Sequence, residues 1–230
     1  MPYHPEPTSI ELESVEALFG VYPGLRADLR ERLVTLFRDL RALTIRVLEG
    51  TGPDMHEGAM VLLGMLSHTN LWLLGAVQQL TQGNGALWSA CIRGLMEVFG
   101  AIALVTETPD RIVAFVDRGV KAGKLRAAAE RARPGLGGDI DRLSRIVHPG
   151  DRAVFAPYTA INDAKRHAVF IYGPSQFPTA ETQEGGIVVV NIGDLIVDAV
   201  RSLLDRHPDV LGKGKIFMQK LRDNEVSFDP

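Results

Sequence analysis

The sequence predicts a mainly α protein, an up-down bundle of about five long helices with an inserted β-hairpin near the C-terminus. Three observations predict this fold: a leucine stripe at helical spacing, two long apolar segments joined by a short connection, and one region rich in β-branched residues. The chain has 230 residues, of which 46% are hydrophobic and 23% are charged. This composition is typical of a globular protein and excludes a disordered or collagen-like chain.

The chain is expected to form one domain. At this length one large domain is more common than two, and no linker composition divides the sequence. The helical bundle is predicted over 25–206, with the β-hairpin included at 167–191. An N-terminal arm with a short helix is expected at 1–24, and a weakly patterned C-terminal tail at 207–230.

The first helices are predicted from spacing and capping residues. Residues 1–9 are expected to be an arm, and Ser9 is expected to cap a short helix over about 10–19. Between residues 29 and 47, five leucines and a valine recur at alternating spacings of 4 and 3, which predicts a helix with a narrow apolar stripe. Asp54 is expected to cap the next helix.

Two apolar helices are expected in the interior, over about 55–80 and 86–107. The connection TQGNG at 81–85 is short, so the two helices form an antiparallel hairpin. Both are apolar nearly all round, which predicts burial on most sides. The second is apolar enough to suggest a membrane span, but it carries Arg93 and Glu97 at its centre and lacks flanking basic clusters. We therefore expect a soluble protein.

The second half of the chain is expected to combine helices with one hairpin. HAVFIYG at 167–173 and GGIVVVN at 185–191 are rich in β-branched and aromatic residues, and they predict the two strands of the hairpin. Pro149 ends the helix before it, because the residue that precedes a proline avoids helical dihedral angles. The helices of this half are predicted over about 109–131, 139–148 and 192–205.

The cysteine and histidine content of the sequence limits the cellular compartment and the kinds of metal or disulfide site that are expected. Cys91 is the only cysteine, so the chain forms no intramolecular disulfide and no cysteine-rich zinc site. The six histidines lack metal-ligand spacing, and we expect neither a metal nor another cofactor. The N-terminus is acidic and proline-rich, unlike a signal peptide. A cytoplasmic location is therefore predicted, with no membrane partner.

The formal net charge of −3 excludes a general argument for nucleic-acid binding, but the charge is unevenly distributed. From Arg111 to Arg152 the chain has ten basic and five acidic residues, whereas residues 1–20 contain four acids and neither Lys nor Arg. A local basic face suits a phosphate-bearing partner. A solvated helix face gives the same pattern, so both interpretations stay open.

Arg93 and Glu97 are the only charged residues from Ala86 to Val105, and their spacing places them on one helical face. Buried ions require partners. With the hairpin turn near residue 83 or 84, Glu97 is level with Asn70, in the segment SHTN that also contains His68. We expect a polar layer between the two helices, which either fixes the helix register or lines a pocket.

The short helix before Pro149 also carries polar residues on one flank. The residues around this flank are, in order, Ser144, His148, Asp141 and Arg145, and Arg142 points nearly opposite to the buried stripe. One interpretation is structural: His148 caps the end of its helix, where free carbonyl groups favour a cation, and Asp141 pairs with Arg145 on the surface. The other interpretation is a functional site.

An Arg followed four to six residues later by a His, within an all-α bundle, resembles the motif of the HEPN superfamily (higher eukaryotes and prokaryotes nucleotide-binding domain). The larger pattern is similar to bacterial members of that superfamily, in which an apolar helix with R-x-x-x-E precedes a helix with L-S-x-x-x-H and then a hairpin. The resemblance covers about residues 25–205. Its elements here are Arg93 with Glu97, Leu143 and Ser144 with His148, and the 167–191 hairpin.

The resemblance implies RNA binding or metal-independent RNA cleavage, commonly across a dimer. His148 would be the acid and base, and Arg142 or Arg145 would stabilise charge on the phosphate. A homodimer with RNA as its candidate partner is expected on this basis. The alternative is a non-catalytic helical scaffold or partner-binding protein, in which Arg93 and Glu97 belong to a register-fixing network. A small-molecule sensor with a pocket over the polar layer is a third hypothesis.

Overall fold

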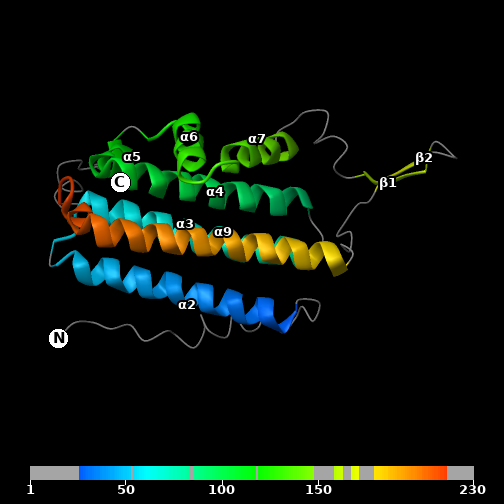
Figure 1. Ribbon diagram of the computed structural model, residues 1–230, viewed down its shortest axis with the longest axis horizontal. Coiled ribbons are helices and arrows are strands. Elements are labelled where there is room, and N and C mark those ends of the chain that lie inside the picture. Colours follow the sequence, from blue (N-terminus) through cyan, green and yellow to red (C-terminus); the bar gives the residue numbers. More distant parts are fainter. Residues whose placement is uncertain are drawn as a thin grey trace, which may run out of the picture.

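The computed structural model of the chain confirms a mainly α fold (Figure 1). The residues that the structure describes are 26–52, 54–82, 85–117, 119–147, 158–162, 167–170 and 179–216. The arm and short helix predicted for 1–24 lie outside them, as does the tail beyond residue 216. Four long helices form the bundle: α2 (Ala27–Gly50), α3 (Glu57–Thr81), α4 (Gly85–Glu107) and α9 (Thr179–Arg206).

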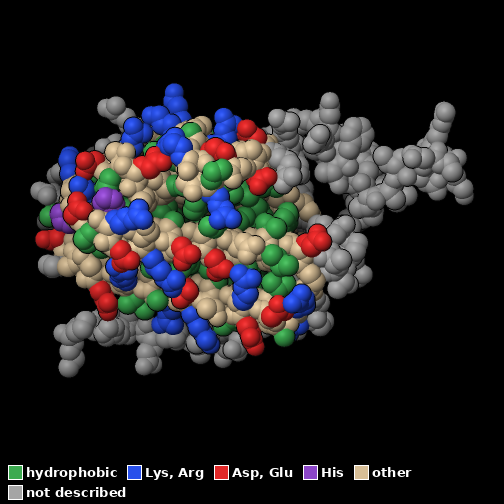
Figure 2. All heavy atoms as spheres, viewed as in Figure 1, with side chains coloured by type: hydrophobic (Ala, Val, Ile, Leu, Met, Phe, Trp, Pro, Cys, Tyr) green, Lys and Arg blue, Asp and Glu red, His purple; other side chains and the backbone are tan. Residues whose placement is uncertain are grey.

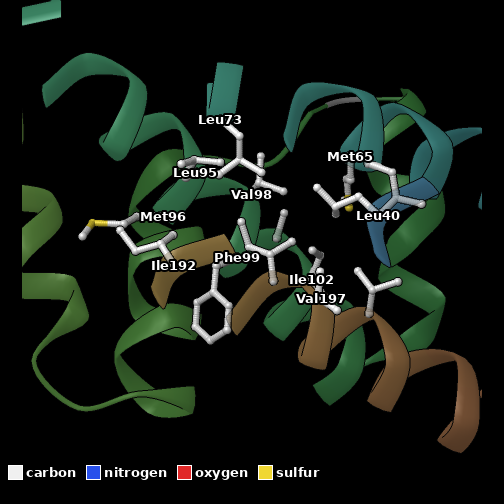
Figure 3. Close-up of a cluster of buried hydrophobic side chains, with 14 of the residues drawn as sticks. Leu40, Met65, Leu73, Leu95, Met96, Val98, Phe99, Ile102, Ile192 and Val197 are labelled. Atoms are coloured by element: carbon white, nitrogen blue, oxygen red, sulfur yellow. The ribbon is translucent and has the colours of Figure 1, made fainter. Parts of the chain in front are cut away.

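The leucine stripe of α2 packs into the bundle as predicted. All six of its members are buried, and they contact a core to which each long helix contributes. Figure 3 shows Leu40 of α2, Met65 of α3, Ile102 of α4 and Val197 of α9 among these core side chains. The helices α2, α3, α4 and α9 contact one another in that order around the bundle, and α9 also contacts α2 and α3.

The direction of α9 departs from a simple up-down bundle. Three ion pairs join it to α2, and their residue numbers rise together along both helices, so α2 and α9 run parallel. Helices α6 and α7, which follow α4 in the chain, lead back along the bundle, and α9 starts at the end of the bundle where α2 starts (Figure 1). The pairs are Arg32–Asp194, Asp39–Arg201 and Arg46–Asp205.

The β-hairpin predicted over 167–191 is not confirmed. Residues 185–191, expected to be its second strand, lie inside α9, which starts at Thr179 rather than near 192. Val189 and Val190 are buried one turn before the next core positions of the helix, so packing overrides the β propensity of this segment. The strand β2 (His167–Phe170) pairs instead with β1 (Tyr158–Asn162) in an antiparallel ribbon.

The single helix expected over 109–131 is divided in the structure. Gly119 has a φ of +64°, a left-handed conformation that interrupts helical geometry. The helix predicted from about residue 139 begins earlier, at Leu136. The segments are the 3-10 helix η1 (Pro109–Val113), α5 (Ala114–Asp117), α6 (Ala122–Ala132) and α7 (Leu136–Val147).

Helices α6 and α7 form an additional layer on α4 (Figure 1). A Cβ atom at Gly100 would collide with the backbone carbonyl of Leu125, so a glycine is needed where α4 and α6 approach each other. This layer lies on the side of α4 away from α2 and α9 (Figure 1). As a result, α4 is surrounded by α3, α9, α6 and α7.

The prediction that α3 and α4 are both buried on most sides holds only for α4. Both helices are long and apolar enough to cross a bilayer, judged by length and composition alone. In α4, 78% of the apolar window is buried within the protein, as in a core helix. In α3 the share is 39%, because within the described residues no layer equivalent to α6 and α7 covers its outer side.

The start of α3 is held by the chain near its C-terminal end, not by Asp54. The backbone N–H groups of Glu57 and Gly58 donate to the carbonyls of Lys215 and Lys213, which satisfies donors that a helix start leaves free. The buried carboxylate of Glu57 accepts from the N–H of Lys215. Residues 207–216 therefore pack against the bundle, and the 3-10 helix η2 (Pro208–Gly212) buries two side chains in the core.

Candidate functional site

Arg93 and Glu97 form the pair that their spacing predicts. Arg93 Nε donates to Glu97 Oε1 at 2.9 Å, and the Arg93 Nη2 to Glu97 Oε1 distance is also 2.9 Å. The two side chains are 23% and 32% exposed, so the pair is half-buried at the surface of the bundle. The pair lies on the part of the α4 surface that the neighbouring helices do not cover.

Two glycines define that uncovered strip of α4. A Cβ at Gly94 would lie 2.6 Å from the ring of Trp72, which places α3 on this side. Gly100 faces α6 through Leu125. On a regular helix, Arg93 and Glu97 lie between these two directions. The ion pair therefore occupies a strip between α3 and α6, beside the ring of Trp72.

The polar layer expected between α3 and α4 is not formed as predicted. Ser67 and His68 are exposed on the outer side of α3. Thr69 is buried, but its hydroxyl donates to the carbonyl of Met65 one turn earlier in the same helix. Asn70 is about 160° around α3 from Trp72, the residue that contacts α4, so it is turned away from Glu97. The side chains of Ser67, His68, Thr69 and Asn70 thus lie on different faces of α3 and do not form one layer.

The Arg–His motif lies at the limit of the described structure. Arg142, Ser144 and Arg145 are within α7, where only their backbone is described, and His148 lies outside the described residues. Helix α7 itself packs on α4 and α6. Its apolar residues Leu136, Ile140 and Leu143 are buried against the core.

The connection from α6 to α7 is fixed by Glu130, which no sequence pattern indicated, and by Asp141, for which the sequence predicted a different partner, Arg145. Glu130 Oε1 accepts from the N–H of Gly135 at 2.9 Å, and Oε2 accepts from the N–H of Gly137 at 2.8 Å. These N–H groups hold the pKa of Glu130 below its usual value. Asp141 of α7 pairs with Arg126 of α6, so the two helices form one unit.

Basic residues gather on α6, as the charge distribution predicts. In Figure 2, Lys and Arg side chains lie along the top edge of the molecule, above α6. Arg131 makes two hydrogen bonds to Glu107 on α4, at 2.9 and 2.6 Å. They lower the pKa of Glu107 and raise that of Arg131. Lys121, Lys124 and Arg133 are exposed and make no ion pair within the described part of the chain.

The described residues offer little for metal or thiol chemistry. They contain no group of three His, Cys, Asp or Glu side chains that could hold a metal ion. Cys91 is buried, and burial raises the pKa of its thiol, which disfavours the reactive thiolate. What the arrangement provides is cationic: exposed lysine and arginine side chains on α6, next to the helix that carries Arg142 and Arg145.

Comparison with known proteins gives no relative on which to base an assignment. No protein-family model, no curated protein and no solved structure matches this chain.

Proposed function

We propose that the protein binds RNA through the α6–α7 unit and cleaves it by metal-independent acid and base chemistry, as the HEPN-like motif implies. The observation that carries the proposal is the exposed cationic surface formed by Lys124 on α6 and by Lys121 and Arg133 at the two ends of this helix, which make no ion pair with other described residues. Cations of this kind bind phosphate regardless of base sequence. The Arg126–Asp141 pair joins this surface to α7, where the motif begins.

The proposed chemistry requires three roles at one phosphodiester. A base removes the proton of the ribose 2′-hydroxyl, which then attacks the phosphorus and displaces the 5′-oxygen of the next nucleotide. An acid protonates that leaving oxygen, and a cation stabilises the negative charge that develops on the phosphoryl oxygens. His148 serves as base or acid, and Arg142 or Arg145 supplies the cation.

RNA cleavage in the presence of EDTA tests this function. Purified wild-type protein is expected to cut single-stranded RNA, and His148→Ala is expected to lower the rate at least about 100-fold, the contribution typical of one general acid or base. Arg142→Ala and Arg145→Ala, assayed separately, identify the arginine that acts. Cleavage that is unchanged in His148→Ala would exclude the catalytic assignment.

Binding is measured separately from cleavage. Lys121→Ala with Lys124→Ala is expected to weaken RNA binding and to reduce the slope of log affinity against log salt by about 1 per lost phosphate contact. Arg46→Ala is the matched control, since Arg46 is paired with Asp205 on the α2–α9 face. Equal effects of the two changes would indicate non-specific charge attraction rather than a site on α6.

A second function, a non-catalytic helical scaffold, is favoured by the Arg93–Glu97 pair. These two ions satisfy each other on a half-buried strip of α4, as residues that stabilise an arrangement do. Arg93→Met is expected to destabilise the fold by about 1 kcal/mol, because it leaves the Glu97 carboxylate half-buried without this partner. Glu97→Gln keeps an acceptor and is expected to cost less.

Chemical denaturation measures this effect, and Arg46→Met is its control. The Arg46–Asp205 pair is largely exposed, so its loss is expected to cost less than about 0.5 kcal/mol. A scaffold also predicts that Arg93→Met leaves any RNA cleavage unchanged per folded molecule. A large loss of cleavage at full stability would instead place Arg93 in the active site.

A further inference from the structure

The outer side of α3 is an apolar surface without charge. Residues 58–92 contain neither Asp, Glu, Lys nor Arg, although 23% of the whole chain is charged. The exposed side chains on or beside this helix include Leu71 at 62%, Trp72 at 38% and Leu87 of α4 at 52%. We name this surface the α3 face and define it by the exposed or half-buried residues Met60, Gly64, Ser67, His68, Leu71 and Trp72.

The other long surface helices are different. The exposed residues of α2 and α9 include charged side chains along their length, and these form the ion-pair row between the two helices. A contiguous uncharged face with large apolar side chains is typical of an interface. The α3 face is therefore expected to be covered in the working protein.

We propose that the α3 face is the interface between two copies of this chain, packed with their α3 helices antiparallel about a two-fold axis. In an antiparallel helix pair centred between Ser67 and His68, each residue lies opposite the residue at the same distance beyond the centre. Leu71 then lies opposite Gly64 of the partner subunit, and Gly64 lies opposite the partner's Leu71. A large side chain thus meets a glycine at both ends of the contact.

The neighbouring positions follow the same rule. Met60 lies level with Gly75 of the partner subunit, at the α4 edge of the contact, because the Cβ position of Gly75 is turned toward Cys91 of α4. A Cβ at Gly64 would meet nothing within 4 Å in a single chain, so the space above this glycine is open for the partner's Leu71. At the centre, the Ser67 hydroxyl lies opposite the partner's His68, and the two side chains have complementary donors and acceptors.

The size and charge of the face suit a second copy. A helix of 25 residues is about 37 Å long, and with the flanking side chains of α2 and α4 a strip roughly 20 Å wide covers about 700 Å². A standard interface buries about 800 Å² on each partner. After Glu57, α3 carries no Asp, Glu, Lys or Arg, so two α3 helices meet without opposing such charges, and the paired Arg93 and Glu97 of α4 lie at the rim.

A bilayer fits this surface less well. Helices that lie in a membrane interface carry Lys or Arg along their polar flank. From Glu57 to Thr81, α3 has neither, and its opposite side packs on α2, α4 and α9. The proposal does not depend on RNA cleavage, since the α6–α7 unit packs on another side of α4.

Sedimentation velocity of the full-length protein tests the proposal over a concentration series. The wild type is expected to be a dimer, and Leu71→Glu is expected to weaken the dimer at least about tenfold, as a change at the centre of an interface does. Ile187→Glu is the matched control, because Ile187 is also an exposed branched apolar residue but lies on α9, which packs on the opposite side of α3. It is expected to leave the dimer intact.

Two further variants keep the test independent of folding. Gly64→Leu fits within a single chain, so it is expected to melt at or above the wild-type temperature and yet to weaken the dimer at least about tenfold by colliding with the partner's Leu71. Ser67→Cys is expected to form an intermolecular disulfide on mild oxidation, whereas Thr35→Cys on the exposed side of α2 is not.

Three results would overturn the proposal. One is a wild-type protein that stays monomeric at the highest concentration. Another is a dimer that Leu71→Glu and Gly64→Leu leave unchanged. The third is a monomeric wild type that binds neutral phosphatidylcholine vesicles and loses this binding in Leu71→Glu, since a bilayer would then cover the face.

Discussion

Gly135 shows how one residue sets the geometry between α6 and α7. Its φ of +94° lies where side chains with a Cβ are strained, and its N–H donates to Glu130. Gly138, three residues later, has helical geometry, and a Cβ there would meet nothing within 4 Å. A methyl group would therefore strain the backbone at Gly135 but would be accommodated at Gly138.

Gly135→Ala is expected to destabilise the protein by about 1–2 kcal/mol through backbone strain. Gly138→Ala, the matched control, is expected to stabilise it by about 0.5–1 kcal/mol, because alanine is the better helix former. Urea denaturation followed by circular dichroism measures both. Equal effects of the two changes would show that the turn does not need the conformation of Gly135.

At the scale of elements, Glu130 couples the end of α6 to the start of α7. The N–H groups that it accepts from lower its pKa, and a carboxylate also suits the positive end of the α7 dipole. Because the pKa is lower in the folded state than in the unfolded state, this stabilisation is complete above the unfolded pKa. It is lost as the pH falls through the folded value.

Glu130→Gln is therefore expected to lower the Tm at neutral pH. The difference from the wild type is expected to shrink progressively as the pH falls below about 4.3, the ordinary pKa of Glu, because the carboxylate then becomes protonated. Thermal unfolding at a series of pH values measures this. Glu31→Gln, on the exposed side of α2, controls for the loss of one negative charge. A difference that does not change with pH would contradict the role given to the carboxylate.

Helix α9 illustrates why element prediction failed in one place and succeeded in another. The α2 stripe was predicted because its leucines repeat at a helical period and face one core. In α9 the run IVVV at 187–190 favours a strand locally, but the core needs a helix there. Gly193 lies where α9 packs closely on α2, since a Cβ atom at this position would collide with the side chain of Leu36.

The candidate site was also predicted only in part. Arrangements within one helix were predicted, whereas contacts between helices were not. The placement of Arg93 and Glu97 on one face of α4 depends on spacing within one helix, so the sequence predicts it correctly, whereas the partner that it suggested for Glu97 was Asn70. The Asn70–Glu97 layer depends on how two helices are rotated about their axes, and the prediction was wrong. Glu130 binds the turn after α6, and Asp141 of α7 pairs with Arg126 of α6. These contacts lie between segments, so no periodic pattern in the sequence predicts them. The roles of Arg142, Arg145 and His148 stay predictions.

At the scale of the whole molecule, α3 and α4 are equally apolar and yet have different environments. The α6–α7 layer covers α4, whereas the α3 face lies open on the outside of the bundle. The two proposed activities of the molecule use different sides of it. Phosphate binding belongs to the cationic surface of α6, and self-association belongs to α3.

The sequence by itself determined the helical class, the bounds of α2 and α4 to within a few residues, and the Arg93–Glu97 pair. These features depend on interactions within one helix, whose period is known in advance. Only the tertiary structure decided that α9 runs parallel to α2, that residues 185–191 are helical, and that α3 has an exposed apolar side. Those features depend on which elements pack together, and hydrophobicity alone drives burial without specifying the partner.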